Sequence, residues 1–144
     1  MFRKVKAGSA LRIAAHGFIA SGDDPKTKTN TAWDQLYPTA HKFLGLSDVF
    51  GGRSNVAGAA LHATIAFTPT LKAALDGHTF FRPEPGPGKK SYTGSELDIG
   101  LAYAIAPSLS LKGLYAAFVP SKKGPFATDE LQHYVEIELA QVIK

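Results

Sequence analysis

Residues 96–105 read Glu-Leu-Asp-Ile-Gly-Leu-Ala-Tyr-Ala-Ile, and a large apolar residue occupies every odd-numbered position. Successive side chains of a β-strand point to opposite faces, so this pattern places an apolar face opposite a face with Glu96, Asp98 and Gly100. A helix would scatter these three positions around its circumference. The stretch therefore predicts a strand with one apolar and one polar face.

The same two-residue period recurs in five further segments, with apolar side chains again at odd-numbered positions; they span 11–19, 56–67, 71–82, 108–119 and 131–143. These segments are long compared with the ~5–6 residues that are usual in soluble sheets. They are close to the ~9–11 residues that a strand needs to cross a bilayer at a tilt. We therefore expect an all-β fold of about six antiparallel strands.

The connections between these segments fall into two classes. Residues 68–70 and 106–108 form short connections, and each contains a proline that presets a turn conformation. Longer connections span 21–54, 82–95 and 120–130. Short periplasmic turns and long extracellular loops are typical of bacterial outer-membrane barrels. The pattern thus predicts an antiparallel transmembrane β-barrel segment, although a soluble barrel with its apolar face toward a core would also alternate.

Composition narrows the possible functions. The 144 residues suit one domain, and the net charge of +4 comes from basic and acidic residues that are spread along the chain. The sequence contains no basic run or stripe of the kind that indicates a nucleic-acid partner. The absence of cysteine excludes disulfides and thiolate metal sites. No apolar run approaches the ~20 residues of a membrane helix.

The N-terminal residues superficially imitate a signal peptide. Arg3, Lys4 and Lys6 precede a short apolar run at 10–15. Arg12 and His16 interrupt the apolar positions, and no convincing cleavage site follows them. We therefore expect a strand that begins in mid-protein.

Basic side chains on the expected polar face are candidates for binding an anionic solute; they are Arg12, Lys72, Arg82 and Lys112. Fixed cations in a narrow pore raise the local concentration of counter-ions. The alternative is that they pair with acidic residues of neighbouring strands and stiffen the wall. Both interpretations remain open at this stage.

Nothing in the sequence indicates catalysis, a metal or a cofactor. His16, His62 and His78 lie on three different expected strands without an identified carboxylate partner. The four aspartates of the first long connection do not have the spacing of a calcium loop. No nucleophile elbow or phosphate-binding motif is present. We therefore expect a non-enzyme without a metal or another cofactor.

Four short segments stand out from the alternating pattern. Residues 21–24 read Ser-Gly-Asp-Asp, and 33–48 read Trp-Asp-Gln-Leu-Tyr-Pro-Thr-Ala-His-Lys-Phe-Leu-Gly-Leu-Ser-Asp. Later, 76–80 read Asp-Gly-His-Thr-Phe and 94–98 read Gly-Ser-Glu-Leu-Asp. In order and spacing these segments resemble the alginate-export family of outer-membrane proteins, and the resemblance extends from about Leu11 onward. Its distinctive loop positions are Asp34, Tyr37, Pro38, His41 and Asp48.

This resemblance implies that residues 1–144 are the C-terminal part of a single-chain barrel of about eighteen strands. Family members export an anionic polysaccharide through a positively charged lumen. The chain departs from the family because the preceding strands and a terminal aromatic residue are absent, and because its lumen-facing residues are not overwhelmingly basic. The implied partners are an anionic polysaccharide, outer-membrane lipid, and either N-terminal barrel strands or other copies, with no nucleic acid.

The resulting functional hypothesis is an outer-membrane channel segment for export or diffusion of alginate-like polysaccharide or other anionic solutes. Two alternatives stay open. One is a structural or adhesin-like outer-membrane barrel without specific transport, and the other is a soluble ligand-binding β-barrel. Six strands alone cannot close a large barrel, and open edges in lipid would leave unpaired backbone groups.

Overall fold

The computed structural model describes residues 10–34, 36, 44–126 and 128–143. These residues form six strands and no helix; the strands are β1 Ala10–Ala20, β2 Val56–Ala66, β3 Leu71–Phe81, β4 Tyr92–Ala106, β5 Leu109–Pro120 and β6 Gln132–Gln141. Within this described part, no helix is long and apolar enough to cross a membrane. The predicted all-β class and the six strands are confirmed.

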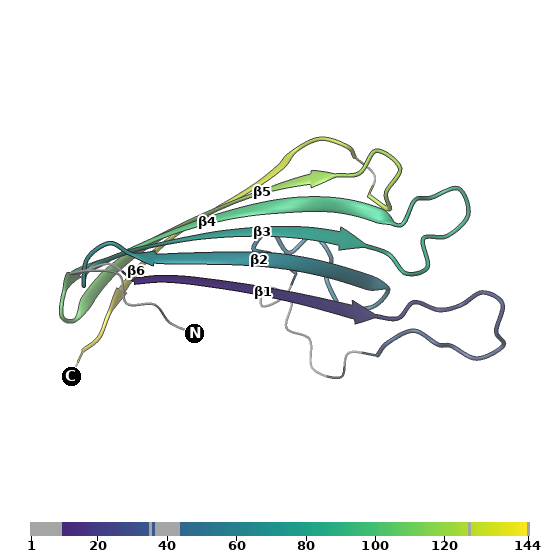
Figure 1. The fold of residues 1–144 in the computed structure, drawn as a ribbon, viewed down its shortest axis with the longest axis horizontal. Coiled ribbons are helices and arrows are strands. Elements are labelled where there is room, and N and C mark those ends of the chain that lie inside the picture. Colours follow the sequence, from purple (N-terminus) through teal and green to yellow (C-terminus); the bar gives the residue numbers. More distant parts are fainter. Residues whose placement is uncertain (1–9, 35, 37–43, 127, 144) are drawn as a thin grey trace.

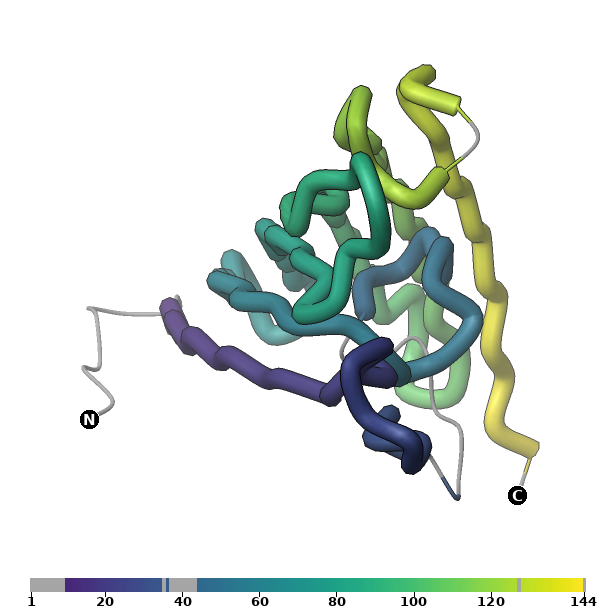
Figure 2. Tube along the Cα trace, turned by 90° about the vertical axis from the view of Figure 1, so that its right-hand side faces the viewer, coloured from purple at the N-terminus to yellow at the C-terminus, as the bar shows by residue number. Residues whose placement is uncertain are grey.

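The strands form one antiparallel sheet in which each strand pairs with the next along the chain, in the order β1-β2-β3-β4-β5-β6 (Figure 1). In the described part of the chain, β1 and β6 are the two edges, and the sheet does not close into a barrel. Viewed from the loop end, the sheet is a curved wall, and residues 44–55 lie on its concave side (Figure 2).

Most predicted strand ends differ from the observed ones by one or two residues, and two of the differences affect the site. β3 ends at Phe81, so Arg82 lies beyond the strand, and β4 begins at Tyr92 rather than at Glu96. The register of the β3–β4 pair shifts between Phe80 and Phe81, as a β-bulge does. The early residues of β4 were missed because Thr93, Gly94 and Ser95 carry no apolar alternation.

The register gives the sheet two distinct faces. Odd-numbered residues pair with odd-numbered residues across every regular ladder, as Leu61 does with Gly77 and Leu75 with Ile99. One face therefore carries large apolar side chains from all six strands. They are exposed, and include Leu11, Ile13, Ile19, Leu61, Leu75, Leu97, Ile99, Leu101, Tyr103, Ile105, Leu111, Val119, Val135, Ile137 and Leu139.

The connections differ in length at the two ends of the sheet, as predicted. Residues 21–55, 82–91 and 121–131 form three long connections at one end, and short turns lie at the other end (Figure 1). In the β2–β3 turn, the Phe67 amide donates a hydrogen bond to the Leu71 carbonyl at 2.9 Å. The periplasmic and extracellular assignments of these ends remain predictions.

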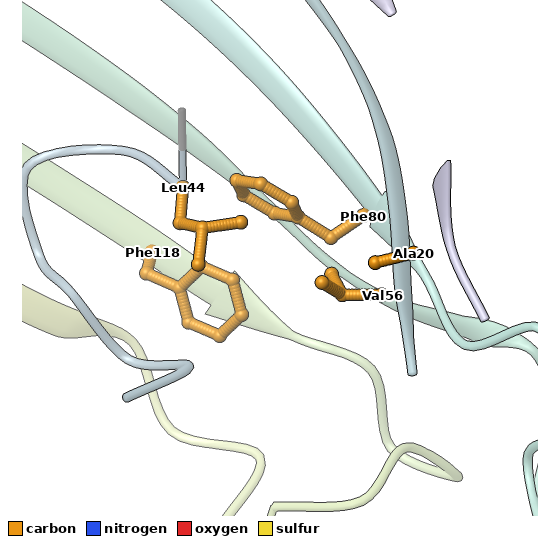
Figure 3. Packing of buried hydrophobic residues seen from close by; sticks show 5 residues of the cluster. All are labelled: Ala20, Leu44, Val56, Phe80 and Phe118. Carbon is orange, nitrogen blue, oxygen red and sulfur yellow. The ribbon is translucent and has the colours of Figure 1, made fainter. Parts of the chain in front are cut away.

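A hydrophobic cluster lies on the even-numbered face near the loop end. Its buried members are Ala20, Leu44, Val56, Phe80 and Phe118 (Figure 3). Phe50 packs against them, with its ring centroid 4.7 Å from that of Phe80 and 5.6 Å from that of Phe126. The face opposite the exposed apolar one is therefore apolar at the loop end and carries charged side chains among small residues along the rest of its length.

Candidate functional site

Antiparallel pairing brings titratable side chains from four strands together on the concave face. His62 of β2 stands opposite Asp76 of β3, and Asp76 stands opposite Asp98 of β4. In the next row, His78 pairs with Glu96. We call this group, together with His16 of β1, the histidine–carboxylate patch. All six side chains lie on the even-numbered face, because the register pairs even-numbered residues with even-numbered residues.

Two histidines of this patch have carboxylate partners, which the sequence analysis did not identify. His62 Nδ1 lies 2.9 Å from Asp76 Oδ1, and His78 Nε2 lies 3.2 Å from Asp98 Oδ2. His62 Nε2 also lies 2.9 Å from His16 Nδ1, and their rings stack. Among the described residues, no group of three or more His, Asp or Glu side chains could hold a metal ion.

Part of the first long connection packs directly onto the patch. We call residues 44–50 the inward segment. The Leu46 amide donates a hydrogen bond to Asp98 Oδ2 at 3.3 Å, and the Ser47 amide donates to Glu96 Oε1 at 3.0 Å. The Ser47 hydroxyl donates to the other oxygen of Glu96. The segment thus supplies three donors to two carboxylates of the wall.

Two further features hold the inward segment in place. Leu44 is fully buried and lies beside Phe80 and Phe118 (Figure 3). Gly45 has a φ of +84°, and a Cβ at this position would overlap the Glu96 carboxylate. Only glycine combines this backbone conformation with such a close approach. The local sequence is therefore adapted to the wall that it contacts.

Burial makes these hydrogen bonds necessary. Glu96 and Asp98 are 3% and 4% exposed, although both are acidic. A carboxylate removed from water is costly unless donors surround it. The inward segment supplies donors to both oxygens of Glu96 and, together with His78, contacts Oδ2 of Asp98. Carboxylates and apolar side chains therefore hold residues 44–50 of the first long connection against the wall.

A second polar region lies nearer the short turns. Lys72 and Lys112 stand in one row on either side of Ala102, two strands apart and therefore about 10 Å from each other. They border a hollow of about 200 Å³ whose floor includes Ala74 and Gly100. The small residues Ala74 and Gly100 leave room for this hollow, and Leu114 also lines it.

The two lysines differ in their surroundings. Lys112 Nζ lies 3.3 Å from Glu138 Oε2 and 3.8 Å from Glu136 Oε1. Lys72 is exposed and has no ion-pair partner among the residues that the structure describes. The predicted cross-strand ion pairs are therefore present for Lys112. Binding of an anionic solute by Lys72 stays a prediction.

The other predicted residues occupy different places. Arg12 is exposed on the even-numbered face of β1, one row from Lys72. Arg82 lies in the 82–91 connection at the opposite end, where its amide donates to the Ser91 carbonyl at 2.7 Å. The structure therefore does not bring Arg82 together with the other three cations, because β3 ends before it.

The predicted family-motif residues are only partly described. Asp34 is exposed in the first long connection, and Asp48 is half-buried with a φ of +53°. Tyr37, Pro38 and His41 lie outside the described residues, as do Arg3, Lys4 and Lys6.

Comparison of the chain with protein-family models, with curated proteins and with solved structures finds no match. The candidate site therefore has to be interpreted from its own geometry.

Proposed function

We propose that this chain forms part of the wall of an outer-membrane β-barrel channel for anionic polysaccharide or other anionic solutes. In this arrangement the odd-numbered face contacts lipid, and the even-numbered face lines an aqueous passage. The observation that carries the proposal is the separation of an exposed apolar face from a polar concave face along six long strands.

The apolar face supports the membrane part of the proposal. Ile13 is 65% exposed, Leu61 59% and Ile137 77%, and these residues come from three different strands. Soluble monomers rarely expose continuous apolar patches larger than a few hundred Å². In a bilayer, such a face contacts lipid chains, which are also apolar. A soluble barrel would instead place these side chains toward its interior, so the arrangement favours the membrane over a soluble ligand-binding barrel.

The charges of the concave face support the anion part. Asp76 contacts His62, Asp98 contacts His78, and Glu96 is held by Ser47. Arg12 and Lys72, in contrast, have no carboxylate partner among the described residues. The cations of this face without an ion pair in the described part of the chain are therefore Arg12 and Lys72, which attract anions, whereas Lys112 faces the two carboxylates of Glu136 and Glu138.

The proposal requires strands beyond the two edges. In lipid, unpaired N–H and C=O groups each cost several kcal/mol, so β1 and β6 need partners on their outer sides. Additional strands of a longer chain would satisfy them, as would other copies of this chain. The alginate-export resemblance of the loop sequences supports the first arrangement.

The proposal is tested by expression in a Gram-negative host behind a cleavable signal, as this chain and with its in-frame upstream sequence. We expect recovery in the outer membrane, extraction only by detergent, and an anion-preferring conductance when the protein is added to planar bilayers. Recovery in the soluble fraction without detergent, or a membrane protein without conductance, would contradict it.

A further inference from the structure

The acidic side chains of the concave face create a physical problem for an anion channel. Asp76, Glu96 and Asp98 lie on two adjacent rows of the wall. Where these carboxylates are ionised, they repel an anionic solute in a narrow passage and favour cations. The question is therefore what covers them.

The donors of the inward segment cover two of the three carboxylates. Glu96 receives two hydrogen bonds from Ser47, and Asp98 receives one from Leu46 in addition to its contact with His78. Hydrogen bonds to ionised acceptors are among the stronger ones in proteins. With this segment docked, Glu96 and Asp98 have almost no contact with solvent.

We propose that the inward segment, residues 44–50, is the selectivity element of this wall. It narrows the passage at the level of Glu96 and Asp98, and it shields their negative charge from a passing anion. This inference rests on the proposed channel function. It gives the segment a part in anion selectivity, in addition to that of the cationic residues.

Two glycines provide a matched pair for testing the docking itself. Gly45→Ala introduces a methyl group that collides with the Glu96 carboxylate, in a backbone with positive φ. Gly51→Ala carries the same type of backbone strain, since its φ is +61°, but the added Cβ meets nothing within 4 Å. The difference between the two variants therefore isolates the contact with the wall.

Hydrogen–deuterium exchange measures whether the inward segment is docked on the wall, independently of any transport. In the wild-type protein we expect the Leu46 and Ser47 amides to be protected, because both donate to buried carboxylates. Gly45→Ala should reduce their protection by about tenfold or more, since loss of one charge-assisted hydrogen bond changes an equilibrium by this order. Gly51→Ala should leave these two amides protected. Equal protection in all three proteins would overturn the docking.

Planar-bilayer recordings on the same proteins test selectivity. Gly45→Ala should raise the conductance and lower the chloride-to-potassium permeability ratio, whereas Gly51→Ala should change neither. Adding Glu96→Gln to Gly45→Ala should restore part of the anion preference, because the exposed side chain is then neutral. A general structural defect would not be rescued in this way.

The outcomes separate the two proposals. If wild-type protein does not conduct, the channel function fails and the selectivity role fails with it. If wild-type protein conducts and Gly45→Ala loses amide protection yet keeps its permeability ratio, only the role of the inward segment is overturned. Where Gly45→Ala does not insert, Ser47→Ala removes one donor to Glu96 without a steric clash, and the same direction of change is expected.

Discussion

His62 of β2 contacts Asp76 of β3 across the concave face, with 2.9 Å between Nδ1 and Oδ1. The second such pair, His78 and Asp98, lies one strand further along the sheet. The two pairs have the same chemistry and different burial, since the His62–Asp76 side chains are 25% and 29% exposed and those of His78–Asp98 are 5% each.

This difference predicts unequal costs for removing each histidine. His78→Gln should lower the free energy of unfolding by about 1.5–3 kcal/mol, because it perturbs a buried charge-assisted contact. His62→Gln should cost less than about 1 kcal/mol, since water can solvate Asp76. Urea titration of the protein in detergent micelles measures both values. Equal losses would mean that burial does not control these contacts.

The His62–Asp76 pair could have been predicted from the sequence, and it was missed. Both residues are seven positions from Pro69, the centre of the short turn, so antiparallel pairing sets them opposite each other. The alternation of apolar residues predicted the strands and their faces correctly. Combining this alternation with the position of the turn centre at Pro69 would also have predicted which residues of the two strands pair.

Other features had no local signal. The inward segment depends on carboxylates about 50 residues later in the chain, and a loop composition does not reveal such contacts. Phe80 and Phe118 occupy positions of the polar face, so alternation alone does not predict that they form a buried cluster. These features depend on packing between residues that are far apart in the sequence. The periodicity of a single segment does not predict such packing.

The adjacent residues Leu75 and Ala74 test which face contacts lipid. Leu75→Lys places a charge on the exposed apolar face near the middle of β3, where the expected cost in a bilayer is about 2–4 kcal/mol. Ala74→Lys places the same charge beside the hollow of the concave face and should cost much less. Urea-dependent folding into lipid vesicles measures the difference. If the apolar face were in water, the two lysine variants would have similar costs, or Ala74→Lys would cost more.

Lys72 tests the electrostatics of the passage. Lys72→Glu should reduce the chloride-to-potassium permeability ratio by a factor of about two to ten, because it reverses an unpaired charge on the concave face. Lys122→Glu, at an exposed position of the 121–131 connection, introduces the same change in net charge outside the strands. Reversal potentials in a salt gradient distinguish the two. A similar effect of both variants would indicate that overall charge, rather than the site of Lys72, sets selectivity.

The aromatic cluster should dominate the stability of the loop end. Phe80 is fully buried, whereas the next residue, Phe81, is 39% exposed on the opposite face. Phe80→Ala should cost about 3–5 kcal/mol of unfolding free energy, and Phe81→Ala clearly less. Urea unfolding in detergent micelles provides the comparison. Equal costs would show that the cluster does not anchor the wall.

The central claim is that the odd-numbered face of the sheet contacts lipid while the even-numbered face lines an aqueous passage. It is tested most directly by spin labels at single cysteines introduced one at a time from Ile99 to Ile105, in a chain that contains no native cysteine. In lipid vesicles, we predict that labels at odd positions collide with oxygen and those at even positions with a water-soluble nickel chelate, alternating along β4. Equal access of the nickel chelate to both sets, or no alternation, would contradict the claim.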